Sequence, residues 1–192
     1  HTAKELMALD LKTGKVAWRV PEAKPRTRLS SLLIANNVVV VGAARRTKAF
    51  SLTDGKPLWE IPTGKESFRG PPDLFAVGGA LWVGTLTTTG LDLKTGKPVK
   101  TIDVPELFTA GHHARCHRAK ATEKYLLWSK RGVEFVDLHA DGHSRNDWFR
   151  GTCRYGVMPA NGLLYSPPHP CFCYPGVKVN GFLALAAERG KG

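Results

Sequence analysis

A short motif recurs along this chain of 192 residues and limits what it can fold into. Similar copies occupy residues 8–18 (ALDLKTGKVAW), 49–60 (AFSLTDGKPLWE) and 90–101 (GLDLKTGKPVKT). A degenerate copy, FVDLHADGHSRNDW, covers residues 135–148, and the front half of another, GFLALA, covers residues 181–186. The chain is therefore built of repeats.

Each copy predicts a β-hairpin. An alternating or apolar stretch enters a Lys-Thr-Gly-Lys or Thr-Asp-Gly-Lys turn and continues into a second stretch that often ends in Trp. A tight hairpin turn needs positive φ, which glycine adopts without steric cost, and a neighbouring Asp or Thr can hydrogen-bond its own backbone. We therefore expect Gly14, Gly55, Gly96 and Gly142 to adopt positive φ in four such turns.

The spacing of these turns predicts the fold class. Gly14, Gly55 and Gly96 are 41 residues apart, and Gly142 follows 46 residues later. A period of this length with only strand patterns between the hairpins is typical of a β-propeller with four-stranded blades. A second strand pair in each period supplies the other two strands, and no stretch has a helical period. We expect an all-β propeller of four-stranded antiparallel blades.

Blade boundaries follow from the same pattern. The motif predicts a partial blade at 5–20, blades at about 26–61, 68–104 and 112–150, and an incomplete blade at 152–186. Both ends offer the third strand of a blade, so closure into four blades would leave one strand redundant. We expect a segment of a larger propeller that can self-associate through exposed blade faces, with a compact four-blade ring as the alternative.

The sequence motif LDLKTGKxxW resembles the pyrroloquinoline-quinone-type (PQQ-like) propeller repeat. That family includes quinoprotein alcohol dehydrogenases and non-catalytic propellers of the bacterial envelope, among them the lipoprotein of the outer-membrane assembly machinery. The last third, with RCHRAKATEKYLLWSKRGVEFVDL, also looks like large propeller proteins of environmental bacteria such as planctomycetes. The resemblance implies a periplasmic or otherwise exported location.

The catalytic pattern of the quinoprotein dehydrogenases does not match this sequence. Those enzymes hold the quinone with two adjacent cysteines, a stacking Trp, a calcium ion and an Asp base, whereas Phe172 here separates Cys171 from Cys173. Glu134 lies within a strand pattern and Asp147 precedes Trp148, so neither is a persuasive base. We expect no catalytic residues and no bound PQQ. A redox or metal- and quinone-binding module related to these enzymes is the alternative function.

The net charge of +12 favours acidic partners. The basic residues are spread through turns and loops without an aromatic-interleaved stripe, which indicates a solvated surface and no nucleic-acid site. The sequence contains no apolar stretch long enough to span a membrane. We expect a protein or an acidic glycan as partner.

Six of the seven His and all four Cys follow residue 111. Aligning ARCHRAKATEKYLLWS with GTCRYGVMPANGLLYS places Cys116 on Cys153 and Leu127 on Leu164, at the entry to the innermost strand of adjacent blades. Loops on one face of the propeller would then bring these side chains together. We predict a binding rim made of His112, His113, Cys116, His117, Arg118, Cys153, Arg154, Tyr155, His169, Cys171, Cys173 and Tyr174.

Three interpretations of this rim stay open. Disulfides fit the even cysteine count of an exported fold, with Cys116 and Cys153 each bonded to one member of the Cys171 and Cys173 pair. A transition metal, zinc or copper, fits the mixture of imidazole and thiol groups. Unpaired, buried Cys beside surface His is the third. The candidate metal ligands are His113, Cys116, His117, Cys153, His169, Cys171 and Cys173.

Other polar and aromatic residues fit structural roles. His139 and His143 are expected to be ordinary turn residues. Trp18, Trp59 and Trp148 end hairpins, where the indole can pack between blades and its N–H can donate to a carbonyl. Trp82 and Trp128 lie on apolar strands and are expected in the core.

The redox state of the rim can be measured directly. With all four Cys in two disulfides, the intact mass of the native, unreduced protein should be four hydrogen atoms below that of the reduced chain, with no metal in elemental analysis. Free thiols together with a stoichiometric transition metal would contradict the disulfides and support the metal site.

Overall fold

The computed structural model describes residues 5–21, 30–43, 45–63, 71–104, 117–130, 132–140, 142–168, 179 and 181–188. The chain divides into two compact units. The first contains residues 1–66 and 70–101, and the second contains residues 67–69 and 102–192. All regular structure in the described residues is β-strand.

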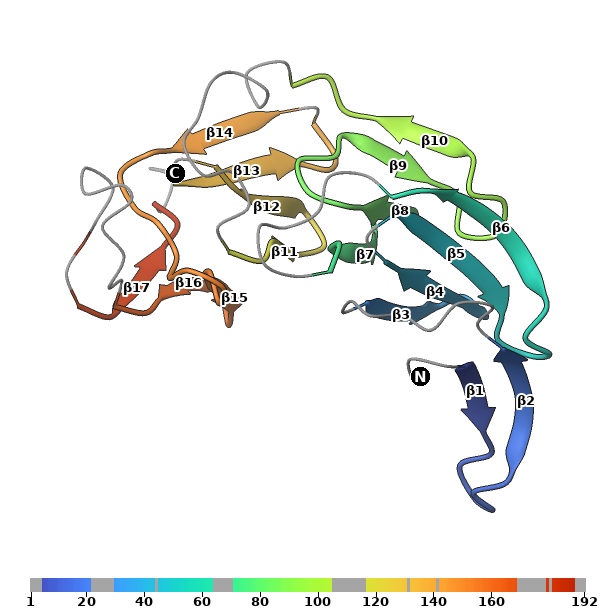
Figure 1. Cartoon of the computed structure of the whole chain (residues 1–192). Coiled ribbons are helices and arrows are strands. Elements are labelled where there is room, and N and C mark those ends of the chain that lie inside the picture. The colour runs from blue at the N-terminus through green and yellow to red at the C-terminus, as the bar shows by residue number, and fades with distance from the viewer. Residues whose placement is uncertain are drawn as a thin grey trace. The chain divides into compact units, whose positions relative to one another are not determined.

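The first unit contains three antiparallel sheets, whose strands can be followed in Figure 1. In each sheet, strands that are consecutive in the sequence are hydrogen-bonded neighbours. The two-stranded sheet is β1 (Glu5–Leu9) and β2 (Val16–Pro21). The first four-stranded sheet is β3 (Ser31–Ala35), β4 (Val38–Gly42), β5 (Arg46–Ser51) and β6 (Pro57–Pro62). The second is β7 (Leu74–Val77), β8 (Ala80–Val83), β9 (Thr89–Leu91) and β10 (Pro98–Thr101).

The second unit contains two antiparallel sheets of the same meander type. The four-stranded sheet is β11 (Lys120–Ala121), β12 (Tyr125–Ser129), β13 (Val133–Asp137) and β14 (His143–Asn146). The three-stranded sheet is β15 (Met158–Ala160), β16 (Leu163–Ser166) and β17 (Leu183–Ala186).

The hairpins between the first and second strands have their own turn chemistry. Three of them are two-residue loops with positive φ at both positions, as in a type I′ turn, whose twist matches that of the flanking strands. Asn and Gly tolerate this conformation best. The pairs are Asn36–Asn37, Gly78–Gly79 and Asn161–Gly162, with φ between 47° and 74°.

The repeated motif forms the hairpin between the third and fourth strands. The Asp10 amide donates to the Lys15 carbonyl at 2.8 Å, and the Asp10 carboxylate accepts from both the backbone N–H and the hydroxyl of Thr13 at 2.7 Å. These hydrogen bonds lower the pKa of Asp10, the side-chain bond from Thr13 contributing most. Gly14, Gly55 and Gly96 have φ of 69°, 73° and 69°, so their predicted positive φ is confirmed.

The same expectation for Gly142 is wrong. The Asp137 amide donates to the Gly142 carbonyl at 2.8 Å, just as the Asp10 amide donates to Lys15. Gly142 therefore takes the place of the lysine that follows the turn glycine, and its φ lies outside the left-handed region. The glycine place falls on residue 141, outside the described residues.

Two tryptophans join consecutive sheets of the first unit. The indole N–H of Trp18 on β2 donates to the Leu52 carbonyl at 2.8 Å, and a Cβ at Gly55 would lie 2.7 Å from the Trp18 ring. The same arrangement recurs one repeat later, where Trp59 on β6 donates to Leu93 at 2.8 Å. The predicted packing of these two indoles between blades is confirmed.

The remaining tryptophans divide into core and surface. Trp82 and Trp128 are fully buried, which confirms their predicted core positions. Trp148 is 55% exposed, with its ring 4.5 Å from that of Phe149, so the expectation that it is packed away between blades is wrong. It lies two residues beyond the end of β14, past the strand that would hold it against a neighbouring sheet.

Two turn glycines provide a matched test of the indole contact. Gly55→Ala should destabilise the protein by about 1–2 kcal/mol for the left-handed φ and by about 1–3 kcal/mol more for overpacking against Trp18. Gly14→Ala is the control, because Gly14 has a similar φ and no atom within 4 Å of an added Cβ. Urea unfolding of both variants measures the difference. Equal losses of stability would contradict a contribution from the indole contact.

Candidate functional site

Five of the predicted rim residues lie in the described part of the chain. They are His117, Arg118, Cys153, Arg154 and Tyr155, all in the second unit. The other seven, which lie outside the described residues, are His112, His113, Cys116, His169, Cys171, Cys173 and Tyr174. Whether the twelve form one rim stays a prediction.

Cys153, Arg154 and Tyr155 form the tip of a tight turn. The turn is closed by a bridge between Thr152 and Gly156, in which the Gly156 amide donates to the Thr152 carbonyl at 2.7 Å. Arg154 has a φ of 73°, which is unusual for a residue with a Cβ and costs on the order of 1–3 kcal/mol. The Thr152 hydroxyl anchors the turn by donating to the Pro168 carbonyl at 2.9 Å. The surrounding contacts therefore hold a strained backbone in place.

The buried His117 packs against this turn. It is 2% exposed and forms a parallel β-bridge with Arg154, alongside a 3.4 Å hydrogen bond from the Arg118 amide to the Arg154 carbonyl. A Cβ at Gly156 would lie 2.6 Å from Nδ1 of His117, so the imidazole fits because the turn has a glycine there. His117 thus has a structural contact with the turn as well as its predicted place in the rim.

The outer side of the turn is cationic and aromatic. Arg154 is exposed, and Tyr155 is 75% exposed. The Lys120 ammonium group donates to the Tyr155 carbonyl at 3.3 Å, which brings a second cation to the turn. Arginine and tyrosine are enriched at protein interfaces, and paired cations attract acidic groups.

The structure bears on metal binding only in part. Within the described residues, no three His, Cys, Asp or Glu side chains lie close enough together to hold an ion. Of the seven candidate ligands, only His117 and Cys153 belong to that part of the chain. The metal site and the disulfide pairing both remain predictions.

The blade alignment behind the rim is shifted by one residue in both the first and the second strand. The Thr122 amide donates to the Tyr125 carbonyl to close one hairpin, while Ala160 pairs with Leu163 to close the other. Leu164 therefore corresponds to the residue before Leu127, contrary to the predicted match. The hydrogen bonds that close each hairpin fix the register. The sequence pattern did not reveal the shift, because these strands have apolar residues at consecutive positions.

A buried ionisable pair was missed by the sequence reasoning. Nε2 of His143 on β14 lies 2.6 Å from Oε2 of Glu134 on β13, and their side chains are 6% and 0% exposed. His143 is therefore a strand residue, and its assignment to a turn is wrong. Val136 faces His143 and Glu134 faces Arg145, so the pair is diagonal across the strands. A Glu between the apolar residues Val133 and Phe135 of a predicted strand was the available signal.

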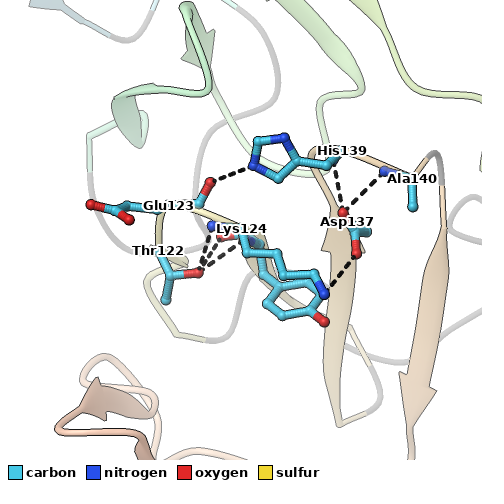
Figure 2. A network of polar contacts seen from close by, with 7 residues as sticks. Thr122, Glu123, Lys124, Asp137, His139 and Ala140 are labelled. Carbon is cyan, nitrogen blue, oxygen red and sulfur yellow. Dashed lines mark hydrogen bonds and ion pairs between the residues drawn. The ribbon is translucent and has the colours of Figure 1, made fainter.

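Figure 2 shows how this blade secures its hairpin ends. The Asp137 carboxylate accepts from the backbone N–H groups of His139 and Ala140 and faces the Lys124 ammonium at 3.7 Å. The hydrogen bond from His139 is the largest cause of the lowered pKa of Asp137. The His139 ring contacts the Glu123 carbonyl at 3.2 Å, which supports its predicted role as a turn residue. This network explains the local order of the hairpin ends.

These sheets define an all-β propeller fold, and comparison with known proteins supports the assignment. BamB from Moraxella catarrhalis matches with a TM-score of 0.59 and 18% identity over 85% of this chain and 48% of BamB. The computationally designed protein Ika8 matches with a TM-score of 0.61 and 12% identity over 97% of this chain and 54% of Ika8. The designed Ika4 matches with a TM-score of 0.54 and 11% identity over 91% of this chain and all of Ika4. The chain spans about half the length of the first two structures.

The sequence profile described as outer membrane protein assembly factor BamB matches residues 1–134. The chain therefore belongs to the BamB-like family of PQQ-type repeats, which confirms the predicted resemblance and propeller fold class. A search of curated proteins found no match. The described part of the chain contains no helix with the length and hydropathy needed to cross a bilayer.

The buried pair gives a prediction about stability. His143→Ala should reduce the free energy of unfolding by about 3–5 kcal/mol, because the Glu134 carboxylate would stay buried without its partner. The double variant Glu134→Leu/His143→Leu should lose much less, because it removes the buried charge as well. Chemical denaturation of the single and double variants provides the comparison. A loss of stability in the double variant as large as that in His143→Ala would show that an unpartnered Glu134 carboxylate is not the cause of the loss.

Proposed function

We propose that this protein is a non-catalytic β-propeller scaffold of an exported bacterial protein, and that it docks an acidic partner through the predicted rim. The observation that carries the proposal is the Arg154–Tyr155 tip, where an exposed cation and an exposed phenol sit on a strained, well-anchored backbone. Strain at an exposed position is typical of functional sites, because surrounding contacts must maintain it.

Membership of the BamB-like family favours a protein partner. The family description names an assembly factor of the outer membrane, so an envelope location and a role in bringing proteins together are the natural extension to this chain. An acidic glycan is the second kind of partner that the cationic tip would accept. Either would gain from charge complementarity with Arg154 and from the large contact area of Tyr155.

The tip itself is preorganised for docking. The Gly156 amide closes the turn, His117 fills the space beneath Gly156, and Thr152 ties the turn to the chain after β16. A partner would therefore bind a surface that needs little further ordering, which reduces the entropic cost of association. The same anchoring argues for a rigid contact surface rather than a flexible loop.

The partner can be sought with a photocrosslinking amino acid in place of Tyr155. We expect one discrete crosslinked protein in the native envelope if a protein docks at the tip. The same crosslinker at Leu11, which is 98% exposed on a repeat hairpin, is the matched control. Polygalacturonate, an acidic polysaccharide, is the probe for the glycan, and its binding should weaken as salt rises.

Arg154→Glu/Tyr155→Ala should weaken binding of the crosslinked protein, or of polygalacturonate, by about thirtyfold or more if these residues are hot spots. Titration calorimetry with the purified partner measures the loss. Lys12→Glu changes one charge on an exposed repeat turn and should leave binding nearly unchanged. Unaltered affinity in the double variant would exclude the tip as the docking site.

A further inference from the structure

A cavity of about 620 Å³ lies between two sheets of the second unit. The sheet β11–β14 contributes Tyr125, Phe135 and Ser144 to its wall. The opposite wall includes Leu185 on β17 and Ala187, which directly follows that strand. The exposed Trp148 also lines it. Its size is within the range of about 300–1,000 Å³ typical of pockets that bind small organic groups.

The cavity lies at the position that an indole fills in the first unit. Ala49 on β5 is opposite Trp59 on β6, and Ala8 is opposite Trp18 in the same way. At the equivalent place in the second unit, Phe135 on β13 is opposite Ser144 on β14. In the second unit the large side chain, Phe135, is therefore on the third strand, and the small one, Ser144, is on the fourth.

Strand pairing supports this equivalence. Ala49 is opposite Val40 on the second strand of its sheet, and Phe135 is opposite Leu127 on the second strand of its own. Val40 and Leu127 are both buried core residues. Ser144 is exposed and has a small side chain. Its side chain therefore does not extend to the next sheet as that of Trp59 does.

The opposite wall retains the counterpart of the indole acceptor. The carbonyls of Leu52 and Leu93 accept the N–H of Trp18 and Trp59, and each follows the third strand of the neighbouring sheet. Leu185 on β17 pairs with Leu164 on β16, just as Phe50 on β5 pairs with Val39 on β4. Ala187, two residues after Leu185, therefore corresponds to Leu52, and it lines the cavity.

We propose that this cavity binds an indole ring, the side chain of a tryptophan presented by a partner polypeptide. The ring would lie between Phe135 and Leu185, and its N–H would donate to the Ala187 carbonyl. A polypeptide is the favoured source because both internal examples are carried by an extended strand, in which Val20 packs beside Trp18 in the same apolar cluster. This site is separate from the Arg154–Tyr155 tip and does not depend on it.

The test is a titration of the full-length protein with N-acetyltryptophanamide, followed by amide chemical shifts. We expect saturable shifts at Ser144 and from Leu185 to Ala187, with none in the hairpin Asp10–Lys15. The 1-methyl derivative, which lacks the N–H, should bind about fivefold to tenfold more weakly, as expected for one lost hydrogen bond. Absence of saturable shifts at the cavity would overturn the proposal, as would equal affinity of the two compounds.

Two substitutions at one position sharpen the result. Ser144→Trp restores the residue found at Trp18 and Trp59, so it should fill the cavity from within and weaken binding by about tenfold or more. Ser144→Ala keeps the cavity open and should bind like the unaltered protein. Unchanged binding by a folded Ser144→Trp variant would contradict the site.

The source of the ring is decided by a further comparison. Free indole in place of the tryptophan amide should bind more weakly, because it lacks the flanking peptide groups. Binding of free indole without binding of the amide would overturn a polypeptide partner. The shift map of the unaltered protein gives a decision even if Ser144→Trp does not fold.

Discussion

The contact on which the repeat architecture depends is the indole that crosses from one sheet to the next. Trp18 and Trp59 each donate to a backbone carbonyl 34 residues further along, and each ring lies against the glycine of the following turn. The indole belongs to one repeat, whereas the carbonyl and the glycine that it contacts belong to the next repeat. Stability therefore comes in large part from the interfaces between neighbouring repeats, as in other repeat proteins.

This contact explains why the motif has both a glycine and a tryptophan. Glycine gives the turn its left-handed φ and also leaves room for the ring, so any other residue at Gly55 would carry two penalties. The tryptophan fills the space opposite a small third-strand residue such as Ala49. The two requirements select the residues of adjacent repeats together, which made the repeats visible in the sequence.

The fold was largely predictable because local chemistry and global pattern agree. The period, the strand alternation and the turn glycines all indicated four-stranded antiparallel blades. The errors occurred where the pattern drifts. In the copy at residues 135–148, one extra residue separates the Asp from the Gly, but the turn keeps its length because the Asp137 amide bonds to the fifth residue after it. Alignment on the glycine therefore misplaced Gly142 by one position.

The candidate site was predictable only as a collection of residue types. Clustering of His and Cys pointed to the chain after residue 111, and the structure describes five of the twelve rim residues. Two features depended on contacts that no spacing rule predicts. Arg154, which has a positive φ, forms a β-bridge with His117, and the buried Glu134 contacts its diagonal partner His143.

The second unit departs from the repeat in a way that leaves an apolar pocket between two of its sheets. Exchanging small and large residues between the third and fourth strands changes little within a sheet, because Phe135 still packs edge-on against Tyr125 with ring centroids 5.6 Å apart. The exchange has a larger effect on the contact between sheets. Phe135, on the third strand, does not reach a backbone carbonyl of the next sheet as Trp59, on the fourth strand, does. A space that a regular repeat would close is therefore left lined by apolar groups and open at Trp148. The motif is broken at Ser144 while the backbone keeps its register, and this leaves unmade a contact that Trp18 and Trp59 make within the chain.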